Sequence, residues 1–212
     1  MFQKIIAENK IHWSQKEFLK AALGGFLLLF IGIIINSLAS NYATERASNW
    51  ITDVVLSNTS VWNVDDIFVY GALLLIVFAI ILGLTEPKYF PFIAVSFFLF
   101  FFIRAIFMSL THLGPFPEHV ILNHQPFLVK LFSGGDMFFS GHTGAPFLLA
   151  LIFWNKKFLR YLFLVLALVF GAVVLLGHLH YSIDVLAAFF ITYTIFEIAK
   201  KIFPKSYAYT LR

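Results

Sequence analysis

The sequence contains no cysteine and very few charged residues for a chain of 212 residues. The absence of cysteine excludes disulfide bonds, thiolate nucleophiles and cysteine-ligated metal sites. Aspartate, glutamate, lysine and arginine together make up 12% of the chain, about half of their share in ordinary soluble domains. So little charge cannot cover the surface of a soluble domain of this size, which excludes the soluble globular class.

The sequence is rich in apolar and aromatic residues instead. Hydrophobic residues make up 60% of the chain and aromatic residues 19%, including 28 phenylalanines. They gather in six segments, at about 18–39, 67–84, 90–111, 138–154, 161–177 and 183–199. Each segment is close to the roughly 20 residues that an α-helix needs to cross the hydrocarbon layer. The sequence therefore predicts an all-α, polytopic integral membrane protein with six transmembrane helices, in a single domain over residues 1–212.

The first segment allows a second interpretation. A basic stretch, a core of about 13 apolar residues and the small residues Ser37 and Ala39 are also features of a cleavable signal peptide. The long basic region and the extension of the apolar run back to Phe18 favour a retained membrane helix. Cleavage would leave five helices without inverting the others.

The basic residues are distributed unevenly between the two sides of the predicted bundle. Of the 15 lysines and arginines, Arg46 and Lys130 lie on one side, Arg104 lies within the membrane, and the other 12 lie on the opposite side. Those residues are Lys4, Lys10, Lys16, Lys20, Lys88, Lys156, Lys157, Arg160, Lys200, Lys201, Lys205 and Arg212. Because positive residues concentrate on the cytoplasmic side, we expect both termini in the cytoplasm. The net charge of +4 therefore reflects orientation, and we expect no nucleic-acid partner. The oligomeric state stays open.

Histidines gather on the non-cytoplasmic side. Six of the seven lie at or beyond the outer ends of the predicted helices: His112, His119, His124, His142, His178 and His180. Residues 139–143 (FSGHT) open the fourth segment, and residues 177–184 (GHLHYSID) connect the fifth to the sixth. Because the fourth helix begins on the side where the fifth ends, we expect both motifs at one membrane level. The predicted site faces the periplasm, a lumen or the cell exterior.

The spacing within these motifs indicates catalysis by histidine. His180 and Asp184 are four residues apart, about one helical turn. The carboxylate can accept a hydrogen bond from one ring nitrogen of His180 and leave the other as a nucleophile. His142, across the site, can supply or remove a proton at the leaving or attacking oxygen. His180, His142 and Asp184 are therefore the candidate catalytic residues.

Neighbouring residues are suited to binding an anion. Ser140, Gly141 and Thr143 lie at a predicted helix start, where free N–H groups and the positive end of the helix dipole attract phosphate. Asp136 either caps this helix or positions substrate. Arg104 interrupts the third segment, where a charge costs about 2.5–3.5 kcal/mol. It lies roughly 21 Å from the cytoplasmic end of that helix, and could hold a lipid phosphate by paired hydrogen bonds.

Further polar residues near the motifs have alternative interpretations. His178 could gate the site, bind the acceptor or merely cap the fifth helix, and Tyr181 could contact substrate or the surrounding lipid. His112, His119 and His124 resemble a metal cluster, but their irregular spacing and the lack of a carboxylate companion favour ordinary loop histidines. We expect no metal and no other cofactor.

The motifs resemble those of a known enzyme family. Residues 135–143 (GDMFFSGHT) and 178–185 (HLHYSIDV) are similar to the third and fourth signature motifs of the sphingomyelin synthase family. That family is a branch of the membrane-embedded phosphatidic acid phosphatase (type 2) superfamily. Residues 104–117, an arginine helix that runs into a proline-containing loop, resemble its second motif, and the first falls within 49–66. The number of predicted helices, six, also agrees with that family, and the resemblance covers most of the chain from about residue 67 onward.

The resemblance implies a lipid phosphotransferase with no metal. His180 would take the phosphoryl head group as a phosphohistidine, His142 would act as the acid–base partner at the lipid oxygen, and Asp184 would orient His180. The implied partners are membrane lipids, namely a phospholipid donor and a ceramide or diacylglycerol acceptor.

The chain departs from the phosphatase branch of the superfamily. Those enzymes usually carry a lysine seven residues before an Arg-Pro pair, and a Ser-Arg pair upstream of the nucleophile. Here Phe97 stands at the position of the lysine, and Arg104 is followed by Ala105 in place of the proline. Val173 and Val174 stand where the Ser-Arg pair would be. These departures favour the synthase branch.

Three functions remain open from the sequence. The first is transfer of a phospho-head group from a glycerophospholipid to ceramide or diacylglycerol. The second is hydrolysis at the same site, as in a lipid phosphate phosphatase or a phospholipase C-like enzyme. The third is a non-catalytic lipid transporter or scaffold, which is disfavoured because the intramembrane charges gather at one face and not at the midplane of repeated halves.

Overall fold

The structure is a computed structural model that describes residues 2–122 and 137–211. Its helices are α1 (Phe2–Trp13), α2 (Lys16–Glu45), α3 (Asp65–Thr85), α4 (Phe90–Leu110), α6 (Gly141–Ile152), α7 (Lys157–Leu176), α8 (Ser182–Ile202) and α9 (Pro204–Thr210). Two short 3₁₀ helices, η1 (Leu56–Asn58) and η2 (Pro87–Tyr89), lie in the connections. The described residues form no β-strand, which confirms the all-α prediction.

Five stretches of helix are long and apolar enough to cross a membrane, namely α2, α3, η2 with α4, α7 and α8. They match five of the six predicted segments and fit a multi-pass integral membrane protein. The segment predicted at 138–154 instead forms α6, which has 12 residues. At 1.5 Å per residue α6 is about 18 Å long, short of the roughly 30 Å hydrocarbon layer. Six full spans are therefore not confirmed.

The apolar run around α6 is longer than the helix for a local reason. Ser140 has an extended backbone and caps the helix, so the apolar residues before it belong to the preceding chain. At the other end the helix stops at Ile152, and a turn leads from Phe153 into α7. The hydropathy of the sequence alone does not mark either end of this helix.

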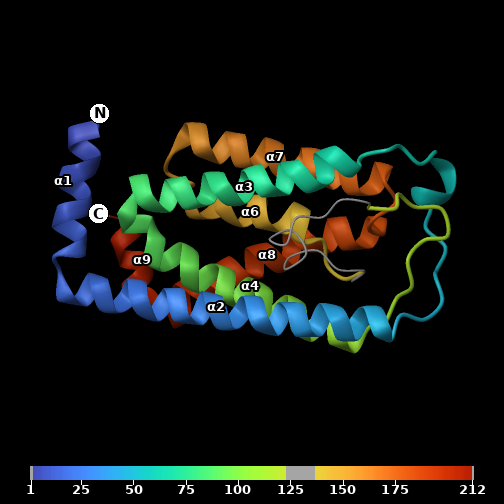
Figure 1. Cartoon of the computed structure of the whole chain (residues 1–212), viewed down its shortest axis with the longest axis horizontal. Helices are drawn as coiled ribbons and strands as arrows, with labels where there is room; N and C mark the ends of the chain where they lie inside the picture. The colour runs from blue at the N-terminus through green and yellow to red at the C-terminus, as the bar shows by residue number, and fades with distance from the viewer. Residues whose placement is uncertain (1, 123–136, 212) are drawn as a thin grey trace.

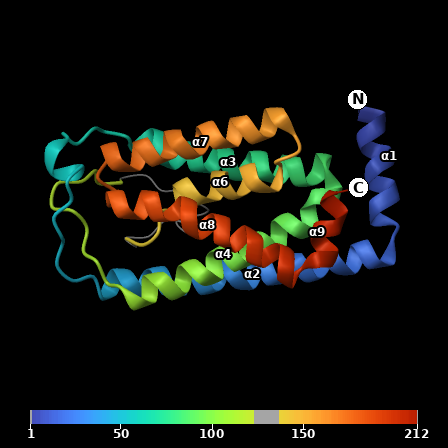
Figure 2. The same ribbon diagram turned by 180° about the vertical axis from the view of Figure 1, so that it is seen from behind.

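The elements are arranged so that the bundle has two distinct ends. Both chain termini, together with α1 and α9, lie at one end, which we call the terminal end (Figures 1 and 2). The connections 46–64 and 111–122 and the α7–α8 turn at 177–181 lie at the other end, which we call the loop end. At the terminal end Lys156 forms an ion pair of 2.8 Å with Glu86, which joins the α3–α4 and α6–α7 connections.

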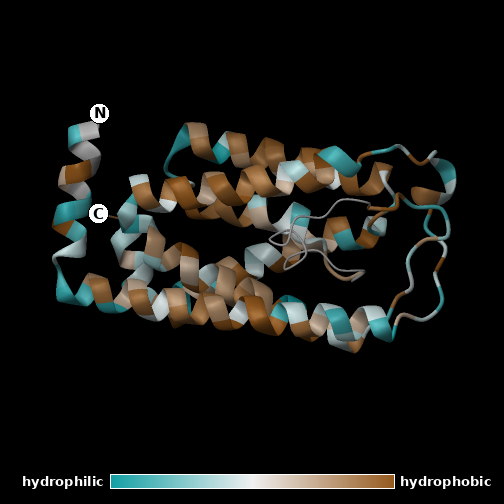
Figure 3. Cartoon of the chain, viewed as in Figure 1, coloured by the Kyte–Doolittle hydropathy of each residue, from teal (hydrophilic) through white to brown (hydrophobic). Residues whose placement is uncertain are grey.

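Apolar side chains cover the long helices on their outer faces. Figure 3 shows hydrophobic residues along the length of the bundle and hydrophilic ones mainly toward its ends and in the loops. On α2 the exposed residues include Leu23, Phe26, Leu27 and Phe30. Exposure of this kind is costly in water and favourable against lipid tails, which agrees with a membrane environment.

Helix α2 packs along α4 through small residues. A Cβ atom at Gly25 would lie 3.2 Å from the Cβ of Ala94, and one at Gly32 would lie 3.2 Å from the Cα of Phe98. Small residues allow membrane helices to approach closely, which strengthens their van der Waals contact. The close approach fixes α2 beside the helix that carries Arg104.

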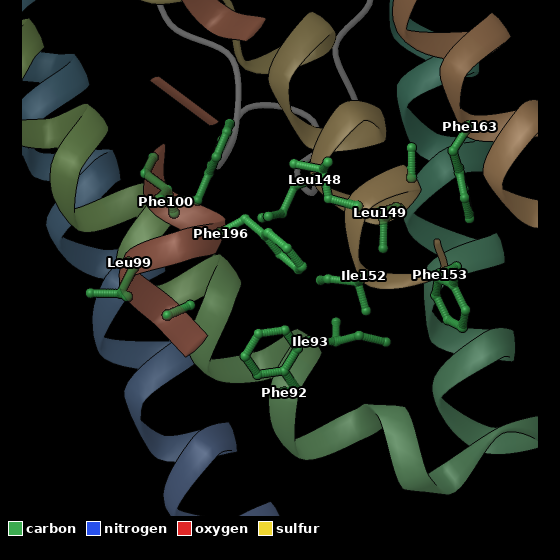
Figure 4. Close-up of a cluster of buried hydrophobic side chains, with 14 of the residues drawn as sticks. Phe92, Ile93, Leu99, Phe100, Leu148, Leu149, Ile152, Phe153, Phe163 and Phe196 are labelled. Carbon is green, nitrogen blue, oxygen red and sulfur yellow. The ribbon is translucent and has the colours of Figure 1, made fainter. Parts of the chain in front are cut away.

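The main core lies between α4, α6 and α8, with α7 on its outer side. Figure 4 shows side chains from these helices pointing toward one another. The labelled residues are Phe92, Ile93, Leu99, Phe100, Leu148, Leu149, Ile152, Phe153, Phe163 and Phe196. Gly144 is essential to this packing, because a Cβ there would lie 2.7 Å from the Phe100 ring and 2.8 Å from Thr192 Oγ1. The core therefore holds α6 between α4 and α8 at a fixed height.

Candidate active site

The α7–α8 turn brings His180 and Asp184 together. Helix α8 begins at Ser182, so His180 precedes the helix and Asp184 lies in its first turn. The His180 Nδ1 atom lies 3.3 Å from Asp184 Oδ2, and the same oxygen accepts a hydrogen bond of 3.1 Å from the Tyr181 backbone N–H. Asp184 is fully buried and His180 is 6% exposed. The carboxylate thus caps its own helix and holds the imidazole.

This contact fixes which nitrogen of His180 is available for chemistry. An ionised carboxylate can only accept hydrogen bonds, so Nδ1 carries the hydrogen in the contact with Asp184. The lone pair of the neutral ring then lies on Nε2. The second carboxylate oxygen, Asp184 Oδ1, is buried and has no hydrogen-bond partner among the described residues. Asp184 is therefore suited to stabilise positive charge that develops on the His180 ring.

A backbone hydrogen bond joins the two sequence motifs. The Ser140 N–H donates to the Asp184 carbonyl oxygen at 3.3 Å, which ties the start of α6 to the first turn of α8. The Ser140 side chain in turn accepts hydrogen bonds from the Thr143 N–H at 3.4 Å and the Thr143 hydroxyl at 3.2 Å. Ser140 and Thr143 are fully buried, and their side chains serve as the helix cap. The motifs predicted to share one membrane level are thus in direct contact.

His142 lies in the first turn of α6 between two aromatic rings. Its imidazole stacks on Phe68 of α3, with centroids 3.8 Å apart and planes inclined by 22°, and it meets the edge of Phe170 of α7 at 5.9 Å. Its Nε2 atom is buried without a hydrogen-bond partner among residues 2–122 and 137–211. His142 also interacts electrostatically with His180 and Arg104. The aromatic pair holds the ring in place and leaves Nε2 unoccupied, while the ring also forms a hydrogen bond with the backbone of Phe68.

Arg104 reaches the start of α6 from α4. Its Nε–H donates to the Phe139 carbonyl oxygen at 2.9 Å and its Nη1–H to Asn36 Oδ1 at 3.2 Å. A Cβ at Gly141 would lie 3.5 Å from Nε and 3.9 Å from Nη2, in ordinary van der Waals contact, so the helix start lies directly beside the guanidinium group. Arg104 is 3% exposed and is the only buried lysine or arginine among the described residues. A single buried positive charge therefore lies beside the N-terminus of α6.

Tyr181 and His178 are used within the protein to fasten loops. The Tyr181 hydroxyl donates to the Gly114 carbonyl oxygen at 2.8 Å and lies 3.3 Å from the Ile51 backbone nitrogen, which donates to it. The His178 Nδ1–H donates to the Glu118 carbonyl oxygen at 2.8 Å, and Nε2 lies 3.2 Å from Thr59 Oγ1. Both ring nitrogens of His178 are thus engaged, and its φ of 52° sharpens the turn. Neither buried side chain faces lipid.

The other histidines predicted as loop residues lie apart from this centre. His119 Nδ1 donates to the Phe116 carbonyl oxygen at 2.6 Å, and His112 packs against the Tyr42 ring at 5.2 Å. Within the described part of the chain no group of three histidine, aspartate or glutamate side chains could hold a metal ion. Two residues singled out from the sequence, His124 and Asp136, lie outside the described residues.

Asp53 is a site residue that the sequence analysis did not single out. It lies in the loop after α2 and is 8% exposed. Its Oδ2 atom accepts hydrogen bonds of 2.8 Å from both the N–H and the hydroxyl of Ser182, the first residue of α8. Its Oδ1 atom accepts from the N–H groups of Val55 and Leu56. Asp53 thus fixes the start of the helix that carries Asp184.

The hydrogen bonds also set the ionisation of Asp53. Burial alone would raise the pKa of its carboxyl group, but the hydrogen bonds from Leu56, Ser182 and Val55 outweigh burial and lower the pKa below its ordinary value of 3.8. A group with a lowered pKa stabilises the folded protein above the unfolded-state pKa. This contribution is lost as the pH falls through the lower, folded-state pKa.

We expect Asp53→Asn to destabilise the protein at neutral pH by about 1–3 kcal/mol. The amide group has one acceptor oxygen where the carboxylate has two, so at least one buried N–H group would lose its hydrogen-bond acceptor. The melting temperature of purified protein should fall at pH 7, and its decline between pH 5 and pH 3 should be shallower than in the wild type. Asp66→Asn, an exposed residue in the first turn of α3, is the matched control. An unchanged acid dependence in Asp53→Asn would contradict the assignment.

Comparison with known proteins gives one match. Residues 133–202 match the family model described as "PAP2 superfamily C-terminal". The matched stretch is a third of the chain and contains His142, His180 and Asp184. No curated protein and no solved structure gives a significant match. The family match supports the phosphatidic acid phosphatase type 2 superfamily, and with it an enzyme of the lipid phosphatase or phosphotransferase kind.

Proposed function

We propose that the protein is a membrane-embedded lipid phosphotransferase of the sphingomyelin synthase type. It moves a phospho-head group from a glycerophospholipid to a lipid alcohol, either ceramide or diacylglycerol. The observation that carries this proposal is the joining of the two motifs, in which Asp184 holds His180 through its side chain and Ser140 through its carbonyl oxygen. A nucleophile, its orienting carboxylate and a helix N-terminus are thereby brought to one place.

The reaction runs in two balanced steps. In the first, His180 Nε2 attacks the phosphorus atom of the donor, the bond from phosphorus to the diacylglycerol oxygen breaks, and His142 gives its proton to that oxygen. In the second, His142 takes the proton of the acceptor hydroxyl, whose oxygen attacks the phosphohistidine and releases His180. Asp184 stabilises the positive charge on the His180 ring while the intermediate lasts.

Arg104 and the start of α6 would bind the phosphoryl oxygens. The guanidinium group lies beside Gly141, and the positive end of the α6 dipole attracts an anion to the same place.

The proposal places the loop end on the non-cytoplasmic side and both termini in the cytoplasm. The lysines of the α3–α4 connection, the α6–α7 connection, the end of α8 and α9 all lie at the terminal end. Because positive residues mark the cytoplasmic side, the site then faces the periplasm, a lumen or the exterior.

A lipid product assay tests the function. Purified protein in vesicles is given phospholipids labelled in the head group, with ceramide or diacylglycerol present or absent. We expect a labelled new lipid that requires the acceptor. Release of water-soluble label without an acceptor would mean hydrolysis at the same site, as in a phosphatase or phospholipase C-like enzyme. No labelled product from any phospholipid donor would contradict the proposal and favour a transporter or scaffold.

A further inference from the structure

Phe68 contacts the proposed acid–base histidine, His142, in two ways. Its ring stacks on the His142 imidazole with centroids 3.8 Å apart, and its backbone forms a hydrogen bond with the same imidazole. Phe68 lies on α3 and His142 on α6. Helix α3 therefore holds both a face and a nitrogen of the His142 ring.

The hydrogen bonds of α3 show which atoms form the contact. The Phe68 N–H already donates to the Val64 carbonyl oxygen at 2.8 Å, so the Phe68 carbonyl oxygen is the partner of the ring. Because a carbonyl oxygen can only accept, a ring nitrogen of His142 donates to it. This nitrogen is Nδ1, since Nε2 has no hydrogen-bond partner among the described residues. With the hydrogen on Nδ1, the lone pair of the neutral ring lies on Nε2.

The start of α3 is fastened to the end of α7, which keeps Phe68 over His142. The two helices lie side by side (Figures 1 and 2). Phe68 is 5% exposed and belongs to an apolar cluster with residues near the end of α7. Val64, one turn earlier, lies so close to Gly177 that a Cβ at this glycine would be 2.5 Å from Val64 Cγ2. This packing fixes the position from which Phe68 contacts the imidazole.

Gly71 completes the enclosure of the His142 ring. It lies three positions after Phe68, on the same face of α3. A Cβ at Gly71 would lie 2.9 Å from the Phe170 ring, so the absence of a side chain there lets Phe170 lie against α3. Phe170 in turn meets the edge of the His142 ring at 5.9 Å. The imidazole thus has one ring on its face, one at its edge and a carbonyl group at Nδ1, which leaves Nε2 for the substrate.

We propose that Phe68 is a positioning residue for the proton transfers at the lipid oxygen. Its carbonyl group keeps the Nδ1 hydrogen of His142 in place, and its ring holds the imidazole. Nε2 then gives its proton to the diacylglycerol oxygen in the first step and takes one from the acceptor hydroxyl in the second, while the Nδ1 hydrogen stays on the ring. The inference rests on the proposed function, because it takes His142 as the acid–base partner.

This role extends the site beyond the part of the chain that matches a family. His142 lies within residues 133–202, which match the family model, and Phe68 lies outside them. Helix α3 is then a required part of the site and not only a membrane anchor.

A double-mutant cycle tests whether Phe68 acts through His142. Phe68→Leu keeps the backbone carbonyl and an apolar side chain and removes the stacked ring. The rate of product formation from the phospholipid donor in vesicles should fall about 3-fold to 10-fold, the worth of one aromatic pair. In the His142→Ala background the same substitution should change the rate by less than about 2-fold, because two residues that act together have coupled effects. A purely structural role would lower the rate equally in both backgrounds.

Phe78→Leu is the matched control for this cycle. Phe78 also lies on α3, and its ring contacts Phe163 with centroids 5.7 Å apart. The substitution removes an aromatic contact from the same helix without touching His142. It should leave the rate unchanged in both backgrounds.

The hydrogen position on His142 can be measured in the wild type, without any change in packing. Nitrogen NMR of protein with isotope-labelled histidines reports which ring nitrogen carries hydrogen, and the signals of His142 are those missing from His142→Ala. At a pH where the ring is neutral, we expect the hydrogen on Nδ1. Hydrogen on Nε2 of the neutral ring would overturn the inference, and this result decides the matter if Phe68→Leu does not fold.

The outcomes separate this inference from the proposed function. If the wild type forms a His142-dependent product while folded Phe68→Leu protein keeps the wild-type rate, the inference is wrong and the function stands. Equal losses in both backgrounds, or an equal effect of Phe78→Leu, would also overturn it. If the wild type forms no His142-dependent product, the proposed function fails and this inference fails with it.

Discussion

Replacing His180 with alanine is expected to lower the rate of lipid product formation by about 10³-fold or more, as loss of a covalent nucleophile does. The fold should persist, because the variant removes one partner of Asp184 and leaves the hydrogen bond from the Tyr181 N–H. The measurement is the product assay in vesicles, beside a melting curve of each protein. His12→Ala, at the terminal end on α1, removes a half-buried histidine far from the site and should have wild-type activity.

Trapping the proposed covalent intermediate provides a second test of the same prediction. With labelled donor and no acceptor, rapid denaturation should trap an acid-labile label on the wild-type protein. Mass spectrometry should locate the label on His180, and the His180→Ala protein should carry none. Retention of activity by folded His180→Ala protein, or a trapped label on another residue, would refute the assignment of the nucleophile.

Replacing His142 with alanine is expected to lower the rate by about 10²-fold to 10⁴-fold, the usual contribution of a general acid or base. The loss should depend on the leaving group, because in the proposed mechanism His142 protonates the departing lipid oxygen. A synthetic donor with a nitrophenol leaving group needs no such proton and should form the phosphohistidine at a near wild-type rate. Single-turnover release of nitrophenol measures this step directly.

A structural role for His142 would give a different pattern. Its ring packs between Phe68 and Phe170, so alanine also removes aromatic contact area. If the variant only loosened this packing, the rate would fall equally for lipid and nitrophenol donors. His142→Phe keeps an aromatic ring between the two phenylalanines and should fold as the wild type does. With the lipid donor, its rate should fall as much as the rate of His142→Ala.

The sequence predicts those parts of the fold that depend on local composition. The segments predicted at 67–84, 90–111 and 161–177 match α3, α4 and α7 closely, because a membrane span is defined by the length of an apolar run. The prediction at 138–154 was too long, because the Ser140 cap and the turn at Phe153 end the helix inside that run. Helices α1 and α9 were missed, because neither forms an apolar segment of membrane length.

In the candidate site, too, contacts between residues close in the sequence were predictable and contacts between distant residues were not. His180 and Asp184 were predictable as a pair because their contact spans one helical turn, and it is present at 3.3 Å. Asn36 and Asp53 were missed because their partners, Arg104 and Ser182, are 68 and 129 positions away. An asparagine inside an apolar run is nevertheless a visible signal, since an amide there requires a partner. The roles of Ser140, Gly141, Thr143, His178 and Tyr181 in substrate binding stay predictions.

The Tyr181 hydroxyl group has a consequence for how the enzyme is made. It joins the loop at Ile51, the loop at Gly114 and the last turn before α8, over a separation of 130 positions. These pieces leave the ribosome far apart in time, and the phenol group can join them only after α7 and the start of α8 have been inserted. A partly synthesised chain therefore lacks the hydrogen bonds that fasten the turn beside His180 to the two loops. Under the proposed function, the site is then completed only when insertion of the chain is nearly finished.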